Sequence, residues 1–267
     1  MTTPSAPLPT VPVEPISFLI GTYNEAERIG DVLQQAVLWA DEVVVIDKES
    51  TDATRAICAS FGPKVRVVVA PFTPQGHEDS VAAIQVPLHR WIWIGTASEI
   101  PTPKVVQEAR RIVSESPNLD LVYVPRKLYS FGFFSKESPW GVKHYPFLVN
   151  RERALIRNQI HRNFCARDEA NTRRIPVSDD CCVHHFTHPT AERYADAMRQ
   201  YFSAESDTED PGQTIVFAHN TAAVEAAREA GFLVVGIGNP QLFGEADLVI
   251  PSLEKVRFLK IIEALGA

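Results

Sequence analysis

The sequence is short of the features that mark secreted, membrane-spanning and nucleic-acid-binding proteins. Its four cysteines, at positions 58, 165, 181 and 182, are too few and too unevenly spaced for a disulfide framework, which indicates a reducing compartment. No apolar run approaches the roughly 20 residues of a membrane helix, so we expect at most peripheral membrane contact. The net charge of -7 argues against nucleic acid as a partner. These absences together predict a cytoplasmic protein.

The beginning of the chain lacks the pattern of a signal peptide. Residues 1–15 contain five prolines and no basic segment followed by an apolar core, so we expect a disordered lead. The 267 residues suffice for one medium and one small domain. We place the first domain at 16–203, an acidic, turn-rich linker at 204–212 and a second α/β segment at 213–267.

The clearest unit is a strand, helix and strand at residues 16–54. An apolar run from Ile16 ends at Gly21, a helix with one apolar face is predicted over 24–40, and a second apolar run ends at Asp47. Open α/β sheets bind ligands beyond the carboxyl ends of their strands. The polar and aromatic residues expected at that edge are Thr22, Tyr23, Asn24, Glu25, Asp47, Ser50, Thr51 and Asp52. This edge is our candidate nucleotide site.

Two motifs in this unit resemble the start of a family 2 glycosyltransferase. They are T-Y-N-E at residues 22–25 and D-K-E-S-T-D at residues 47–52, against T-Y-N-E and D-x-x-S-T-D in the family. The resemblance implies an α/β fold of the Rossmann-like GT-A type. It also implies a nucleotide-sugar donor, for which we expect a UDP-sugar, and a carbohydrate or lipid-linked acceptor.

The resemblance also suggests roles for single residues in donor binding. Tyr23 would stack on the base, although a tyrosine after a core strand is also commonly a packing residue. Asp47 and Asp52 would hydrogen-bond base or ribose, and Asp52 is equally well placed to cap the next helix. Lys48 would meet the diphosphate, or is a solvated surface lysine.

Further elements follow in an α/β order. Helices are predicted over 55–61 and 104–114, and strands over 65–70, 89–94 and 121–125, with an irregular stretch at 71–86. Trp91 and Trp93 lie on a strand that we expect to be buried on both faces.

The metal-binding element of the resembled family is missing. There the strand corresponding to residues 89–94 ends in D-A-D-E, whose aspartates hold a divalent cation against the donor diphosphate. Thr96, Ala97, Ser98 and Glu99 stand at these positions. Mn²⁺ or Mg²⁺ needs anionic oxygen ligands, so we expect no D-x-D metal site, and Thr96 and Ser98 remain candidate donor-binding residues.

The following stretch resembles the acceptor half of lipopolysaccharide-core glucosyltransferases. The residues that match are Val124, Pro125, Arg126, Tyr129, Gly132, Trp140 and His161. The resemblance implies acceptor contacts for Arg126, Trp140 and His161. The family's acid is absent, because Lys143 and His144 stand where it is expected and Arg162 replaces a glutamate.

Residues 178–188 are read as a strand crowded with possible metal ligands. The resemblance makes His184 or His185 a candidate ligand, while hydrogen-bonded polar residues near a strand end are the alternative. Neighbouring residues of a strand point to opposite faces, so the cluster cannot all converge. We therefore assign no metal ligand.

Inverting transfer needs a base within reach of the acceptor hydroxyl. The candidates are Glu99, Glu137, His144 and His161, and we select Glu99 as the catalytic residue. The predicted function is a metal-independent or metal-poor glycosyltransferase. The alternative is an inactive relative that binds nucleotide sugars or serves as a scaffold.

Residues 213–267 are similar to the last third of β-phosphoglucomutase-like haloacid dehalogenase proteins. Strands are predicted at 214–217, 233–237 and 246–250, with a helix at 221–230 and a final helix. Ala218 and His219 occupy the positions of that superfamily's metal-binding acids, and no D-x-D occurs anywhere in the chain. Without nucleophile or metal we interpret the segment as a structural or docking module.

Overall fold

The computed structural model describes residues 13–71, 80–130, 133–134, 141–157, 163–187, 214–252, 261 and 264–265. The chain divides into two units, residues 1–129 with 133–187, and residues 130–132 with 188–267. The predicted linker at 204–212 lies outside the described residues, as do the first twelve residues of the expected lead.

The first unit is built on a ten-stranded mixed sheet. Eight strands follow the order β3-β2-β1-β4-β8-β6-β12-β5, and β7 and β11 also pair with β6. Its parallel half comprises β1 (Ile16–Thr22), β2 (Glu42–Asp47), β3 (Val65–Val69) and β4 (Trp91–Thr96). Its other strands are β5 (Glu99–Pro101), β6 (Leu121–Ser130), β7 (Phe133–Phe134), β8 (Val142–Asn150), β11 (Thr172–Arg174) and β12 (Val183–Thr187). Every strand predicted in this unit is present, and β4 is buried at Trp91 and Trp93 as expected.

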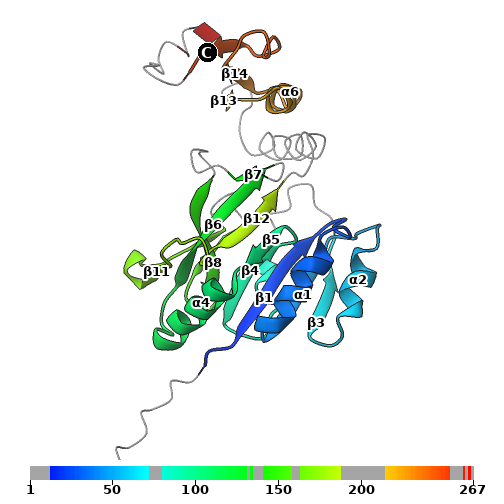
Figure 1. Ribbon diagram of the computed structural model, residues 1–267, viewed down its shortest axis with the longest axis vertical. Helices are drawn as coiled ribbons and strands as arrows, with labels where there is room; N and C mark the ends of the chain where they lie inside the picture. Colours follow the sequence, from blue (N-terminus) through cyan, green and yellow to red (C-terminus); the bar gives the residue numbers. More distant parts are fainter. Residues whose placement is uncertain are drawn as a thin grey trace, which may run out of the picture. The chain divides into compact units, whose positions relative to one another are not determined.

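Three helices cover one face of this sheet. They are α1 (Ile29–Trp39), α2 (Thr54–Ser60) and α4 (Pro103–Glu115), and Figure 1 shows α1 and α4 against the same face. Their apolar stripes pack on Phe18, Trp91 and Trp93. Thr102 begins α4 by accepting a hydrogen bond from Val105 N. The smaller elements are α3 (Ser80–Ala83), a 3₁₀ turn (Glu169–Asn171) and a ribbon of β9 (Leu155–Ile156) with β10 (Phe164–Cys165).

Two elements of this unit begin about five residues later than the sequence predicts, and β6 ends five residues later. The first helix begins at Ile29 and not at Asn24, because Asn24 has a positive φ of 53° and the N–H groups of residues 24–26 donate to the loop that follows β2 and to the first residue of α2. The strand expected from residue 178 begins only at Val183, because a turn closed by Cys181 N and Ser178 O precedes it. Both later starts come from tertiary contacts that local periodicity does not encode.

Residues 214–252 of the second unit have the predicted order of elements, and the predicted final helix falls largely outside the described residues. β13 (Ile215–Ala218), β14 (Leu233–Ile237) and β15 (Leu248–Ile250) form a parallel sheet in that order. Helix α6 (Thr221–Glu229) follows the cap of Asn220, whose Oδ1 accepts from Ala223 N at 2.9 Å. Helix and sheet share a core that includes Val224, Phe232 and Phe243. The likeness to haloacid dehalogenases stays a prediction.

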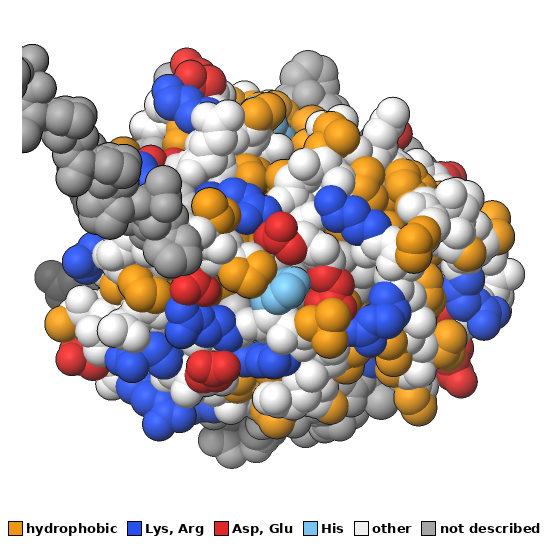
Figure 2. All heavy atoms as spheres, turned by 90° about the horizontal axis from the view of Figure 1, so that it is seen from below, with side chains coloured by type: hydrophobic (Ala, Val, Ile, Leu, Met, Phe, Trp, Pro, Cys, Tyr) orange, Lys and Arg blue, Asp and Glu red, His pale blue; other side chains and the backbone are white. Residues whose placement is uncertain are grey.

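The side of the first unit where the parallel strands begin carries charges of both signs. Glu14 pairs with Arg90, and Asp41 pairs with Arg110 at 2.8 Å. The view from below shows both blue and red side chains, and several blue ones gather at the lower left around a red one (Figure 2). Within the described part of the chain, no helix is long and apolar enough to cross a membrane.

Gly95 in β4 is expected to resist substitution, because a Cβ there would lie 2.8 Å from Phe18 Cζ and closer still to Cε2. The Phe18 ring is fixed in the core against Trp39, with ring centroids 5.1 Å apart. We predict that Gly95→Ala lowers the free energy of unfolding by about 1–3 kcal/mol. Urea denaturation of the variant measures the loss. Gly21→Ala is the control, because its Cβ would meet nothing within 4 Å; equal losses would contradict the prediction.

Candidate nucleotide-sugar site

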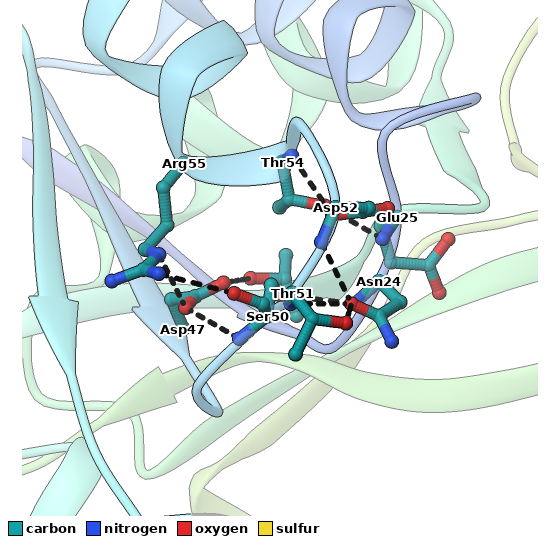
Figure 3. Close-up of polar contacts among 9 residues, drawn as sticks. Asn24, Glu25, Asp47, Ser50, Thr51, Asp52, Thr54 and Arg55 are labelled. Carbon is teal, nitrogen blue, oxygen red and sulfur yellow. Dashed lines mark hydrogen bonds and ion pairs between the residues drawn. The ribbon is translucent and has the colours of Figure 1, made fainter.

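Two loops at the carboxyl ends of neighbouring strands are tied together. The first loop is residues 22–28, after β1, and the second loop is residues 48–53, after β2. Asn24 N donates to Ser50 Oγ at 2.9 Å, and Asn24 Oδ1 accepts from Thr51 N at 2.8 Å. Figure 3 shows the Asn24 side chain pointing toward the second loop. The sequence predicted that these loops meet, and they do.

Asp47 lies beneath both loops and is fully buried. Its Oδ1 accepts from Ser50 N at 3.0 Å and lies 3.6 Å from Arg55 Nε, while its Oδ2 accepts from Thr22 Oγ1 at 3.3 Å (Figure 3). Both oxygens therefore hold the protein's own loops. The predicted contact of Asp47 with a base or ribose stays a prediction, and sequence reasoning did not find Arg55 as its partner.

Asp52 joins the start of α2 to the first loop. Its Oδ1 accepts from Thr54 N at 2.9 Å, and its Oδ2 accepts from Ala26 N at 3.0 Å. The first bond satisfies an N–H in the first turn of α2, although the N-cap residue is Ala53, which makes no side-chain cap hydrogen bond. Thr54 Oγ1 in turn accepts from Glu25 N at 2.8 Å. Each loop thus supplies acceptors for the other, which fixes both before any ligand arrives.

The outer residues of the two loops differ in exposure. The Tyr23 side chain is 42% exposed, which leaves ring surface for stacking. Glu25 is engaged by Arg28, with 2.7 Å between its Oε2 and Arg28 Nη2. Lys48 is partly buried and donates its backbone N–H to Thr22 O at 2.8 Å. Gly21 is exposed, and the space where its Cβ would lie is open.

Glu99 lies inside the turn that joins β4 to β5, and it is 4% exposed. Its Oε2 accepts from Thr96 N, and its Oε1 accepts from Arg126 Nη1, both at 3.1 Å. Burial raises the pKa of this carboxyl, and Arg126 opposes the rise. The carboxylate therefore holds the turn and the arginine and does not face solvent.

The position of a D-x-D metal site offers a poor set of ligands. Thr96 and Ser98 supply neutral hydroxyls, 3.0 Å apart, and Glu99 is paired with Arg126. His185 Nδ1 lies 3.6 Å from Glu99 Oε1, whereas His184 Nδ1 is 3.0 Å from Tyr129 Oη, on the opposite face of β12. The described residues contain no group of three or more His, Cys, Asp or Glu side chains that could hold a metal ion. These residues do not fit a divalent cation.

Only part of the predicted acceptor side falls in the described chain. Trp140 and His161 lie outside the described residues, as does Glu137. Arg126 lies on β6, where its guanidinium carbon is 3.6 Å from the centre of the Tyr145 ring. His144 Nε2 is 2.8 Å from Ile175 O, which positions the imidazole. The sequence did not indicate Tyr145 beside Arg126, and it indicated His185, which lies beside Glu99, only as a candidate metal ligand.

Curated relatives match a short segment of the chain. An uncharacterized glycosyltransferase of Rickettsia felis is 47% identical over 55 residues, 21% of this chain and 19% of the relative. Another from Rickettsia bellii is 49% identical over 57 residues, again 21% of this chain and 19% of the relative. The matched part thus spans about a fifth of these relatives.

Similar solved structures include residues 1–349 of S. aureus TarS in complex with UDP. It is 13% identical, with a TM-score of 0.46, and the match covers 71% of this chain and 65% of that one. The sequence model of glycosyl transferase family 2 matches residues 17–171, from β1 to the 3₁₀ turn. The α/β domain with its mixed sheet is therefore GT-A-like, and the chain belongs to glycosyl transferase family 2.

Proposed function

We propose that the chain is a glycosyltransferase that moves a sugar from a nucleotide-sugar donor, a UDP-sugar in the first instance, to a carbohydrate or lipid-linked acceptor. The observation that carries this proposal is the pair of interlocked loops after β1 and β2. They lie at the edge where α/β sheets bind ligands, with exposed Tyr23 and open space beside Gly21. Family membership adds the reaction class.

In the proposed reaction an acceptor hydroxyl oxygen bonds to the anomeric carbon of the donor sugar. The bond from that carbon to the diphosphate oxygen breaks, the nucleoside diphosphate leaves, and a base takes the hydroxyl proton. Tyr23 stacks on the nucleobase of the donor, while Asp47 and Asn24 hold the two loops in place. Their fixed geometry lowers the cost of ordering the site when the donor binds.

Glu99 is a poor candidate for the base of this reaction. Its carboxylate is buried and accepts from Thr96 N and Arg126, so an acceptor hydroxyl would have to displace one of them. We assign Glu99 a positioning role. The base is then sought among the other candidates, of which His144 is in the described chain.

A second candidate is a nucleotide-sugar binder without turnover. The turn at residues 96–99 favours it, because no aspartate is left there and the one carboxylate is paired with Arg126. Transferase and binder share the donor site and differ in whether the sugar leaves the nucleotide.

We also infer that the second unit serves as a structural or docking module. Ala218 ends β13 and His219 follows it, where the resembled phosphotransferases carry metal-binding acids. Neither side chain supplies the carboxylate that Mg²⁺ prefers. To test whether this unit affects donor binding, UDP binding by a chain that ends at residue 203 is compared with UDP binding by the full chain.

The donor site is tested by thermal shift of the full chain with UDP, UDP-glucose, GDP-mannose and dTDP-glucose, each with EDTA and with MnCl₂. We expect UDP and UDP-glucose to stabilise it in EDTA, by about 2.7 kcal/mol at a hundredfold excess over Kd. Tyr23→Ala should weaken binding by about 1–3 kcal/mol, the worth of stacking on a base. Leu88→Ala, at a side chain that is 72% exposed, is the control.

Release of UDP from UDP-glucose in the presence of sugar and lipid-linked acceptors then separates the two candidates. Acceptor-dependent release supports the transferase, and binding without release supports the binder. If no nucleotide shifts the unfolding temperature, both functions are wrong.

A further inference from the structure

The turn between β4 and β5 differs in charge from a metal-binding turn. Two aspartates would repel a diphosphate unless a cation lay between them, whereas two hydroxyls can donate hydrogen bonds to it. We propose that the hydroxyls of Thr96 and Ser98 bind the donor's diphosphate directly, without a divalent cation between them. This inference rests on the proposed function and specifies how its donor is held.

The two hydroxyls are positioned beside the nucleotide loops. Thr96 is exposed, ends β4 and pairs in register with Gly21 of β1, the residue just before the first loop. The space at the Gly21 Cβ position is open, so a ligand held by the loops can extend toward Thr96. Thr96 Oγ1 and Ser98 Oγ are 3.0 Å apart, and the hydroxyl that accepts from the other keeps its own proton to donate.

The negative charge of the turn faces away from these hydroxyls. Glu99 is the one acid among residues 96–99, and its carboxylate lies inside the turn, bonded to Thr96 N and Arg126. The turn therefore presents two neutral donors in place of an anionic pair. A diphosphate meets no exposed carboxylate in this turn.

Arg126 neutralises the Glu99 carboxylate, so that the turn carries no net negative charge. Glu99 binds both Thr96 N and Arg126 Nη1 at 3.1 Å, so one carboxylate separates the guanidinium from the end of β4. Two neighbouring strands support this pair. On β8, the Tyr145 ring lies 3.6 Å from the guanidinium carbon, and on β12, His185 Nδ1 lies 3.6 Å from Glu99 Oε1. The Arg126 side chain is 15% exposed, so solvent screens its attraction to the Glu99 carboxylate only weakly.

The turn is also rigid, because β12 supports it from the backbone. Phe186 N donates to Ser98 O at 2.9 Å, and His185 pairs in register with Glu99. Hydroxyls that are fixed before binding lose little entropy when they donate to a ligand. The placement therefore favours direct binding of phosphate oxygens.

The test is calorimetric titration of UDP into the full chain, with EDTA and with MnCl₂. We expect binding in EDTA that MnCl₂ changes less than about threefold, since hydrogen bonds to an anion need no metal. Thr96→Val combined with Ser98→Ala should weaken UDP binding by about 10-fold to 100-fold. Ser60→Ala, on the exposed end of α2, is the matched control. Thr96→Ser combined with Ser98→Thr keeps both hydroxyls, so its affinity for UDP should lie within about threefold of wild type.

A pair of substitutions that adds negative charge to the turn makes the test independent of lost packing. Thr96→Asp with Ser98→Asp should weaken UDP binding in EDTA by at least about tenfold, whereas Ser60→Asp should not. Wild-type binding that disappears in EDTA and returns with MnCl₂ would overturn the inference, as would unchanged affinity in the Val/Ala variant. If wild type binds no nucleotide under either condition, the proposed function fails and the inference falls with it.

Discussion

Arg126→Gln is expected to lower the free energy of unfolding by about 3–5 kcal/mol at pH 8, because it leaves a buried carboxylate without its cation. The carboxylate is that of Glu99, 4% exposed, and Arg126 Nη1 is its charged donor at 3.1 Å. Chemical denaturation of wild type and variant gives the difference directly.

The free energy of unfolding of Arg126→Gln should also depend on pH, and the burial of Glu99 determines the sign of this dependence. Burial raises the pKa of Glu99 above its ordinary 4.5, and Arg126 is the largest opposing cause, so its loss raises the pKa further. A folded state with the higher pKa binds the proton more tightly than the unfolded chain. The free energy of unfolding therefore falls as pH rises above 4.5, and the deficit of the variant is small at the acid end and grows toward pH 8.

Two controls separate this effect from lost packing. Arg126→Gln combined with Glu99→Gln should recover much of the loss and lose the pH dependence, because no buried charge remains. Arg153→Gln removes an arginine at 3.1 Å from buried Asp120, which keeps hydrogen bonds from Arg167 N and Asp168 N. Arg153→Gln should lower the free energy of unfolding by about 1 kcal/mol. A pH-independent loss in Arg126→Gln would refute the charge argument.

The meeting of the two loops was predictable, because the ends of β1 and β2 can be read from short segments of the sequence. Apolar runs ending at Gly21 and Asp47 fix where two strands stop, and parallel strands bring their carboxyl ends to one edge. The polar residues that follow each run must then lie there. The same reasoning gave the order of elements in the second unit, from β13 to β15.

The roles of single residues at that edge were less predictable. Asp47 was expected to contact a ligand, yet both its oxygens are engaged within the protein by Ser50 N, Arg55 and Thr22. Spacing says which residues reach an edge, and it does not say which of them bind each other. Asn24 was likewise placed in a helix, because a positive φ at one residue leaves no periodic signal.

The surroundings of Glu99 depend on contacts between distant parts of the chain. β5 pairs with β12, so that Glu99 faces His185, and Arg126 arrives from β6. Such registers follow from the packing of the whole sheet and not from a local pattern. The sequence offers Glu99 as a candidate base and does not show these contacts. The missing aspartates, in contrast, were visible in the sequence itself.

Asp47→Ala is expected to abolish stabilisation by UDP and to lower the free energy of unfolding by about 2–4 kcal/mol. The alanine leaves Ser50 N and Thr22 Oγ1 without their acceptor in a fully buried position, and it removes the partner of Arg55. Ser50 Oγ accepts from Asn24 N, so a second loop that loses its anchor at Ser50 also releases the first. The thermal shift with UDP and the denaturation midpoint measure the two effects on one preparation.

Two further variants show whether stability and UDP binding depend on the hydrogen bonds of Asp47 or on its charge. Asp47→Asn keeps an acceptor for Ser50 N and an amide that can donate to Thr22 Oγ1, so it should retain more than half of the stability that alanine loses. Asp31→Ala, at an exposed acid in the first turn of α1, should change neither measurement appreciably. UDP binding by Asp47→Ala at wild-type affinity would mean that the loops need no common anchor, and that the donor is held elsewhere on the sheet.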